Sequence, residues 1–307
     1  MKQSQPLRIE SNKFYSFATC KTVNSSLWFV NNPKLEENIL AYLAKYQEKY
    51  SVTLYSFVIQ GNHYHLLAKF NQPNRAQFFR DFNARIAELV KKYVRSFGEG
   101  PVFQRRYSEQ AIPLESDLED RFFYCALQPV QAGLCKKISE YPGYNSCFDA
   151  IQGKVREFTL TNWSEYNSLK RYSKKIDISD FQETYSLKFD KLPNRDKLCN
   201  KQYRSELFKK LEKERLTIVA NTESFMGKNK LLKVKPGSKP KTTKRSTRGS
   251  KRPLVLTKCL KTKQVFLDWY FGVYATFKEA SKRYLKGDLE VSFPPNTYKP
   301  PLILVSA

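Results

Sequence analysis

The sequence has few histidines, few acidic residues relative to basic ones, and no long apolar run. Its only two histidines, His63 and His65, lie two positions apart, so any chemistry that needs imidazole must use this pair. No run of about eighteen apolar residues occurs, and residues 1–10 are polar. We therefore expect neither a membrane-spanning helix nor a secretory leader, and we expect a cytoplasmic protein.

Cysteine is present but forms no recognisable pattern. The six cysteines are scattered and include no Cys-x-x-Cys pair, which is the usual signature of a zinc cluster. The spacing therefore predicts no zinc cluster and no disulfide framework. Reduced thiols fit the expected cytoplasmic setting.

Basic residues greatly outnumber acidic ones. The chain has 54 Lys and Arg against 29 Asp and Glu, a formal charge of +25. A surplus of this size attracts polyanions, so nucleic acid is the expected partner and a membrane surface is the competing interpretation. The 19 Tyr and 22 Phe suit both a packed core and the stacking of unpaired bases.

Hydrophobic periodicity predicts an α+β unit in residues 1–150. Apolar residues at helical spacing predict helices at 33–50, 74–97 and 117–127. Aromatic and β-branched runs predict strands at 13–23, 52–60, 63–70 and 102–112. The order strand, helix, strand, strand, helix, strand is the split βαβ pattern. We predict a ferredoxin-like domain whose antiparallel sheet carries helices on one face, with one further helix after it.

The remaining half of the chain is predicted to be a basic C-terminal extension in three parts. Residues 151–227 form a basic extension with a helix at 203–219. Residues 228–252 contain eleven Lys or Arg and no acid, which predicts a flexible basic linker. Residues 253–307 regain apolar residues and predict a small C-terminal segment with a helix.

The histidine pair is the first candidate site. His63 and His65 lie at i and i+2 of a predicted strand, so both side chains point to the same face of the sheet while Tyr64 points to the other. Two imidazoles on one face can bind a divalent metal ion together. For an arbitrary His-x-His, a pair of ordinary polar side chains at a sheet edge is the competing interpretation.

Tyr124 and Gln128 are the second candidate pair. Their i to i+4 spacing on the helix predicted before Pro129 places a phenol and an amide on one helix face. The amide oxygen is a candidate third metal ligand, and the phenol is a candidate nucleophile toward a bound phosphate. A metal ion would offset the negative charge that develops at the phosphoryl group, which matters because a free tyrosine is a poor nucleophile at neutral pH.

Three segments resemble motifs of one family. Gly61–Leu67 (GNHYHLL) resembles its HUH strand, and Val102–Tyr107 (VFQRRY) resembles its W-Q-x-R-Y segment. Tyr124–Leu134 (YCALQPVQAGL) resembles its Y-x-x-x-N-P-V-x-A-G-L segment, and Tyr141–Tyr144 (YPGY) resembles the turn that follows. The chain therefore resembles the single-tyrosine HUH transposases of the insertion-sequence-200-like superfamily, most closely the REP-associated tyrosine transposase branch.

This resemblance implies a function and a role for each candidate residue. His63, His65 and Gln128 would bind Mg²⁺ or Mn²⁺, and Tyr124 would become bonded to a DNA 5′ phosphate while the 3′ hydroxyl leaves. The implied partner is single-stranded DNA whose ends form imperfect palindromes or hairpins, in a bacterial-type cell where the protein is associated with the nucleoid. Phe103 stands where the family usually has Trp, and Gln128 where this branch often has Asn.

Other residues are candidates for DNA contacts or for the chemistry itself. We expect five basic residues to contact DNA: Lys91, Lys92, Arg95, Arg105 and Arg106. For the two arginines, a solvated strand face is the competing interpretation. Tyr107, in the basic Q-R-R-Y context, is the rival nucleophile to Tyr124. Its alternative role is that of a core residue on a strand.

Three functions remain open from the sequence. The first is a DNA strand transferase, which needs both the histidines and Tyr124. The second is a protein of the same fold that binds DNA or RNA hairpins without cutting them. The third is a ribonuclease that uses the histidines as acid and base and does not need Tyr124. We expect a monomer or a weak dimer in solution, which sedimentation of the pure protein would test.

Overall fold

The computed structural model describes residues 6–173, 175–240 and 254–301. Its centre is a four-stranded antiparallel sheet with the strand order β2-β3-β1-β4. The strands are β1 (Tyr15–Lys21), β2 (Val52–Gln60), β3 (His63–Phe70) and β4 (Ser108–Ile112). The predicted α+β class and the ferredoxin-like strand order are confirmed.

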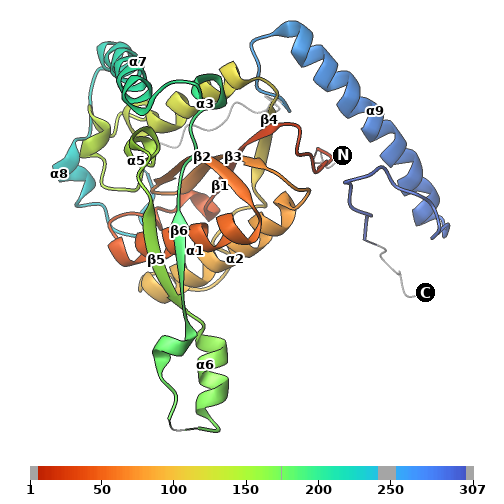
Figure 1. Ribbon diagram of the computed structural model, residues 1–307, viewed down its shortest axis with the longest axis horizontal. Helices are drawn as coiled ribbons and strands as arrows, with labels where there is room; N and C mark the ends of the chain where they lie inside the picture. Colours follow the sequence, from red (N-terminus) through yellow and green to blue (C-terminus); the bar gives the residue numbers. More distant parts are fainter. Residues whose placement is uncertain (1–5, 174, 241–253, 302–307) are drawn as a thin grey trace.

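The helices of this unit cover both faces of the sheet. Helices α1 (Pro33–Lys49) and α2 (Arg75–Tyr93) lie side by side on one face, and α3 (Glu115–Ala126) lies on the other (Figure 1). Tyr64 of β3 packs against Phe82 of α2. Its neighbour His65 faces Tyr124 of α3. Because side chains point alternately to the two faces of a strand, consecutive residues of β3 contact different helices.

The first turns of α1 and α2 are capped by side chains that accept hydrogen bonds from backbone N–H groups. The Asn32 side chain accepts a bond from the Leu35 N–H at 3.0 Å, and Pro33 occupies the first helical position. At α2 the cap comes from a distant residue. The buried Glu10 carboxylate accepts bonds from the N–H groups of Arg75 and Ala76, both at 3.1 Å.

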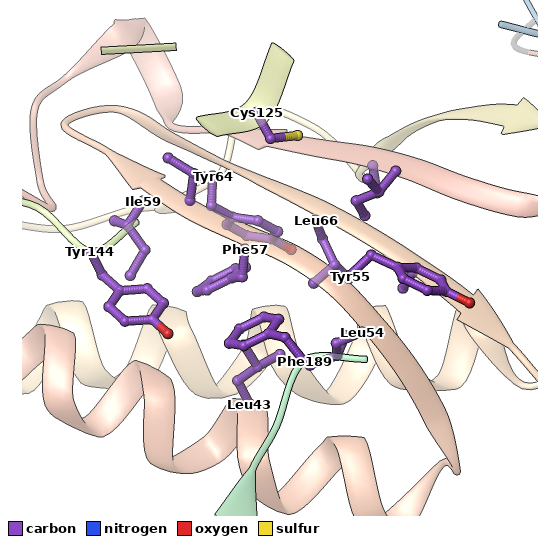
Figure 2. Close-up of a cluster of buried hydrophobic side chains, with 14 of the residues drawn as sticks. Leu43, Leu54, Tyr55, Phe57, Ile59, Tyr64, Leu66, Cys125, Tyr144 and Phe189 are labelled. Carbon is purple, nitrogen blue, oxygen red and sulfur yellow. The ribbon is translucent and has the colours of Figure 1, made fainter. Parts of the chain in front are cut away.

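The hydrophobic core fills the space between the sheet and the α1–α2 layer. Figure 2 shows Phe57, Tyr64 and Leu66 of the sheet above Leu43 of α1, with Phe189 inserted among them. Phe189 belongs to the part of the chain beyond residue 150. The first 150 residues and residues 187–211 of the extension therefore share one core, while Val255, Phe266 and Tyr270 belong to a second, smaller cluster.

Part of the extension folds onto this core. Leu187, Tyr203 and Leu207 are buried in the same cluster, and the predicted helix at 203–219 is confirmed as part of α7 (Asn200–Ala220). The sequence did not predict the hairpin of β5 (Arg156–Thr161) and β6 (Gln182–Leu187), or α6 (Trp163–Lys170) at its tip. Elsewhere in the described residues, the short helices are α4 (Gln128–Gln131), α5 (Cys147–Gln152) and α8 (Lys228–Leu231), and 3-10 turns lie at Val23–Ser25, Ile138–Glu140, Ile178–Phe181 and Pro193–Arg195.

The predicted linker at 228–252 is described only up to residue 240. Within that part, α8 is held by Asn31, whose Nδ2 donates to the carbonyls of Leu231, Leu232 and Val234 at 2.8–3.1 Å. In this part of the chain, Asn31 satisfies the end of α8 and Leu231 is buried, while the flexibility of the linker stays a prediction. Residues 241–252 lie outside the described residues.

The C-terminal segment packs on the start of the chain. Helix α9 (Leu260–Leu285) contacts Phe14 through Phe266 and Trp269, and Leu254 and Leu256 flank Ala111 at the edge of β4. Residues 253 and 302–307 of this predicted segment lie outside the described residues. Within the described ranges, no helix is both long and apolar enough to cross a membrane.

Candidate active site

The two histidines lie at the start of β3, directly after a tight turn. Gly61 and Asn62 form this turn, as predicted, and Gly61 packs so closely on Leu27 and Val30 that an added Cβ would lie 2.8 and 2.9 Å from their side chains. The His63 and His65 rings share one face of the sheet, with their centroids 4.8 Å apart. This separation allows a single ion to bind both imidazoles.

A hydrogen bond from the turn determines the tautomer of His63. The Asn62 Nδ2 donates to the Ser25 carbonyl at 3.2 Å, so the amide oxygen of Asn62 faces His63. This oxygen lies 2.7 Å from His63 Nδ1, which must therefore carry the proton. In this tautomer Nε2 carries the lone pair, as a metal-binding histidine requires.

His65 has a matching partner on the neighbouring strand. Thr19 of β1 pairs directly with His65, and its Oγ1 lies 2.9 Å from His65 Nδ1. The Phe17 ring stacks on the His65 ring at 5.2 Å and restricts its rotation. Both histidines thus have the oxygen partner on Nδ1 that orients metal-binding imidazoles in proteins.

Tyr124 of α3 lies over this pair. Its half-buried ring is 6.2 Å from the His65 ring and 5.9 Å from the Phe17 ring, centroid to centroid. Buried Phe122, Phe123 and Cys125 on either side of Tyr124 anchor α3 to the sheet. The phenol and the imidazoles therefore belong to one site built from β1, β3 and α3.

Arg121 was missed in the sequence analysis and lies next to the phenol. Its Cζ is 4.6 Å from the centroid of the Tyr124 ring and 5.6 Å from that of Phe17. The signal was present, because residues at i and i+3 share a helix face. It was not used because an arginine on a predicted helix is usually a solvated residue. The guanidinium is therefore placed to make a cation–π contact with the Tyr124 ring.

The predicted i to i+4 spacing requires Gln128 to lie on the same helix as Tyr124, but the helix of Tyr124 ends before Gln128. Helix α3 ends at Ala126, and Gln128 begins the separate turn α4. Pro129 has no N–H to bond to the Cys125 carbonyl, so the hydrogen-bond pattern of α3 cannot continue through it, and the break falls at Leu127. The Gln128 side chain donates to Gln131 Oε1 at 3.2 Å.

The donor set limits how a metal ion could be held. Among the described residues, no three His, Cys, Asp or Glu side chains are grouped as metal ligands. The two imidazoles fit a divalent ion, and a further ligand would have to be an amide oxygen such as that of Gln128, a water molecule or a substrate phosphate.

Arg105 and Arg106 lie in a bulge beside the histidines. Thr22 pairs with Phe103 and Thr19 pairs with Ser108, so three steps along β1 correspond to five along the opposite chain. The additional residues include the two exposed arginines. The segment 102–107 is therefore a bulge rather than the predicted strand. Because Gln104 N–H bonds to the carbonyl of Lys21, which pairs with His63, the bulge borders the site.

Tyr107, the rival nucleophile, is a core residue. It is 5% exposed, its ring stacks on Phe79 at 3.9 Å, and the Arg8 guanidinium lies over it at 4.1 Å. Burial raises the pKa of Tyr107 to about 12, which disfavours the phenolate. Tyr107 therefore has the alternative role that the sequence left open, that of a core residue.

Lys91, Lys92 and Arg95 lie away from Tyr124. The lysines end α2, which covers the opposite face of the sheet from α3, and Arg95 follows the helix. All three are exposed, and Ser96 next to them donates to the Pro236 carbonyl at 3.1 Å. They therefore border the 233–239 segment rather than the histidine pair.

Two solved structures are similar to part of this chain. No protein-family model and no curated protein matches the chain. Among solved structures, the chain is similar to a REP-associated tyrosine transposase bound to a REP hairpin, at 16% identity and a TM-score of 0.40, covering 47% of this chain and 82% of that one. It is also similar to the tRNA(His) guanylyltransferase of Saccharomyces cerevisiae, at 11% identity and a TM-score of 0.33, covering 46% and 68%. Neither likeness assigns this chain to a family.

Proposed function

We propose that this protein cleaves and rejoins single-stranded DNA through a covalent bond between Tyr124 and a 5′ phosphate. The observation that carries the proposal is the position of the Tyr124 ring 6.2 Å from His65, whose own ring is 4.8 Å from His63. A phenol beside two oriented imidazoles on one sheet face suits nucleophilic attack on a phosphodiester.

The proposed cleavage exchanges one phosphoester for another. The Tyr124 Oη attacks the phosphorus, and its proton passes to solvent. The bond from phosphorus to the 3′ oxygen breaks, and that oxygen takes up a proton and leaves as a 3′ hydroxyl. Rejoining is the reverse, in which a 3′ hydroxyl attacks the phosphotyrosine and Tyr124 regains its proton. No net energy source is needed, because each step replaces one ester with another.

Each residue of the site has a proposed role in this exchange. His63 and His65, with Gln128, would hold Mg²⁺ or Mn²⁺, which when bound would offset the charge that develops on the phosphate. Asn62 and Thr19 keep the imidazoles oriented through the Nδ1 contacts. Arg121 would hold the Tyr124 ring in place through its contact with the ring face. Arg105 and Arg106 at the bordering bulge would hold the strand by its phosphates.

The test is a search for the covalent adduct. Purified protein is incubated with labelled hairpin-forming single strands taken from beside its own gene, with Mg²⁺ or Mn²⁺, and run on a denaturing gel. We expect a protein–DNA adduct that disappears with Tyr124→Phe and with EDTA. Tyr107→Phe is the matched control and should leave the adduct in place, because its ring packs on Phe79.

Two results would contradict the proposal. The first is DNA that is retarded on a native gel but forms no adduct, whichever hairpin and whichever metal is used. This result would indicate a hairpin-binding protein that does not cut DNA. Cleavage that continues in Tyr124→Phe but stops in His65→Ala would indicate acid–base hydrolysis instead.

A further inference from the structure

The hairpin of β5 and β6 forms an arm that projects from the body of the protein (Figure 1). The hairpin begins at the core, where Arg156 makes two hydrogen bonds to Asp149, at 2.5 and 3.2 Å. Its two strands run along α1, and Lys45 of α1 pairs with Glu183, near the outer end of the hairpin, at 3.5 Å. The six residues of each strand span about 20 Å, so the part that projects is the tip beyond them. Its tip consists of α6 and the 3-10 turn Ile178–Phe181.

The tip of the arm exposes aromatic rings. Helix α6 buries none of its residues, Trp163 is 52% exposed and Tyr172 is 86% exposed. Trp163 contacts Tyr166 at 5.9 Å, and Tyr166 contacts Phe181 at 5.6 Å, centroid to centroid. The inner rings thus support Trp163 while its outer surface faces solvent. Exposed, supported rings are the platforms on which unpaired bases stack.

The tip of the arm carries both acidic and basic side chains. Glu165 accepts a bond from the Asn162 side chain at 2.9 Å, and Asp177 accepts one from the Ser179 N–H at 2.9 Å. These acids cap local structure. Lys170, Arg171 and Lys175 are exposed, and within the described ranges none of them forms an ion pair. Lys170 donates to the Tyr166 hydroxyl at 2.9 Å and lies 4.9 Å from the centroid of its ring. Asp180 is the third acid, so the described tip has no net charge, and its cations lie beside the aromatic rings.

We propose that the tip of this arm is a second binding element for single-stranded nucleic acid. Unpaired bases would stack on Trp163 and Tyr172, and Lys170, Arg171 and Lys175 would contact the phosphates between them. A single strand fits better than a duplex, because base pairs within a duplex do not present their faces to a ring. The inference does not depend on cleavage at Tyr124.

Charge separates this occupant from a second copy of the chain. A second copy would bring another formal charge of +25 to a chain that already carries the same charge. A polyanion instead releases counterions when it binds a chain with this surplus of positive charge. The arm base packs on α1, on the opposite side of the sheet from α3 (Figure 1). A strand that reaches both the tip and Tyr124 must therefore pass around the protein.

The experiment measures binding of the full chain to a labelled thirty-nucleotide oligothymidine by fluorescence anisotropy in EDTA. We expect Trp163→Ala and Tyr172→Ala each to weaken binding by about fivefold or more. Phe271→Ala, which removes a 55% exposed ring of α9, is the matched control and should not change affinity. Quenching of tryptophan emission by the oligonucleotide should fall in Trp163→Phe, although Trp28 and Trp269 remain.

The outcomes separate this proposal from the proposed function. Equal affinity of wild type, Trp163→Ala and Tyr172→Ala would overturn it. Self-association in sedimentation that disappears with Trp163→Ala would also overturn it, because a second copy would then occupy the tip. Tyr124→Phe should bind the oligothymidine as wild type does, so loss of the adduct and loss of tip binding are independent results.

Discussion

The two faces of the central sheet are built from the same strands but differ in character. Under α1 and α2, Tyr64, Phe57 and Phe82 form a buried aromatic cluster with ring centroids 5.5–6.0 Å apart. On the face covered by α3, the side chains of His63, His65 and Tyr124 bring polar atoms together. One strand, β3, thus contributes alternate residues to the core and to the candidate site.

Tyr64 should carry the largest stability effect. Tyr64→Ala removes a fully buried ring, and we expect it to lower the free energy of unfolding by about 3–5 kcal/mol in urea denaturation. Tyr64→Phe loses only the 2.7 Å bond to Asn83 and should cost about 1 kcal/mol. On the other face, His63→Ala should cost about 1 kcal/mol or less while abolishing the adduct. Equal stability losses at Tyr64 and His63 would remove the distinction between the faces.

An ion cluster holds α3 over the histidine face. The Glu119 carboxylate accepts bonds from Arg195 at 2.7 and 2.9 Å and from Lys210 at 2.7 Å. Burial acts to raise the pKa of Glu119, but these bonds and one from Asn194 outweigh it and lower the pKa to about 2. Because the folded pKa lies below the ordinary value near 4.5, the stabilisation is complete above pH 5 and is lost as the pH falls toward 2.

Glu119→Gln should therefore remove a pH-dependent part of the stability. Between pH 5 and pH 2 we expect wild type to lose about 3 kcal/mol more than the variant, measured by urea denaturation at each pH. Glu206→Gln, which changes the exposed partner of Arg195, is the matched control and should follow wild type. Parallel pH profiles for Glu119→Gln and wild type would show that this cluster does not hold α3.

Thr19 tests whether the polar face is organised for a metal ion. Thr19→Val keeps the shape of the side chain but removes the oxygen 2.9 Å from His65 Nδ1. If the imidazole binds a metal, Mn²⁺ affinity measured by calorimetry should fall about 10- to 100-fold. Thr159→Val, on the exposed side of β5, should leave affinity unchanged. Unaltered affinity in Thr19→Val would argue against His65 as a ligand.

Arg121 should have the smallest effect of the four. Arg121→Gln removes the cation 4.6 Å from the Tyr124 ring and should slow adduct formation by about 2- to 30-fold, the range expected for a cation–π contact. Arg121→Lys should recover part of the rate because it retains the charge. If Arg121→Gln formed the adduct at the wild-type rate, the role of Arg121 would be limited to packing on Phe17.

The sequence by itself determined the sheet unit and the histidine pair. The strands at 52–60 and 63–70 were predicted with the bounds that the structure has, because both contain alternating or continuous apolar residues interrupted by the Gly61–Asn62 turn. The shared face of His63 and His65 followed from the two-residue period of a strand. Local periodicity is sufficient for such features.

Only the tertiary structure decided which other residues join the pair. The contact of Tyr124 with His65, the burial of Tyr107 and the position of Arg121 depend on how α3 and the 102–107 bulge lie on the sheet. The arm at 156–187 was also missed, since its short strands and half-exposed residues give weak periodic signals. Contacts between residues far apart in the chain depend on packing across the core, which local periodicity does not encode.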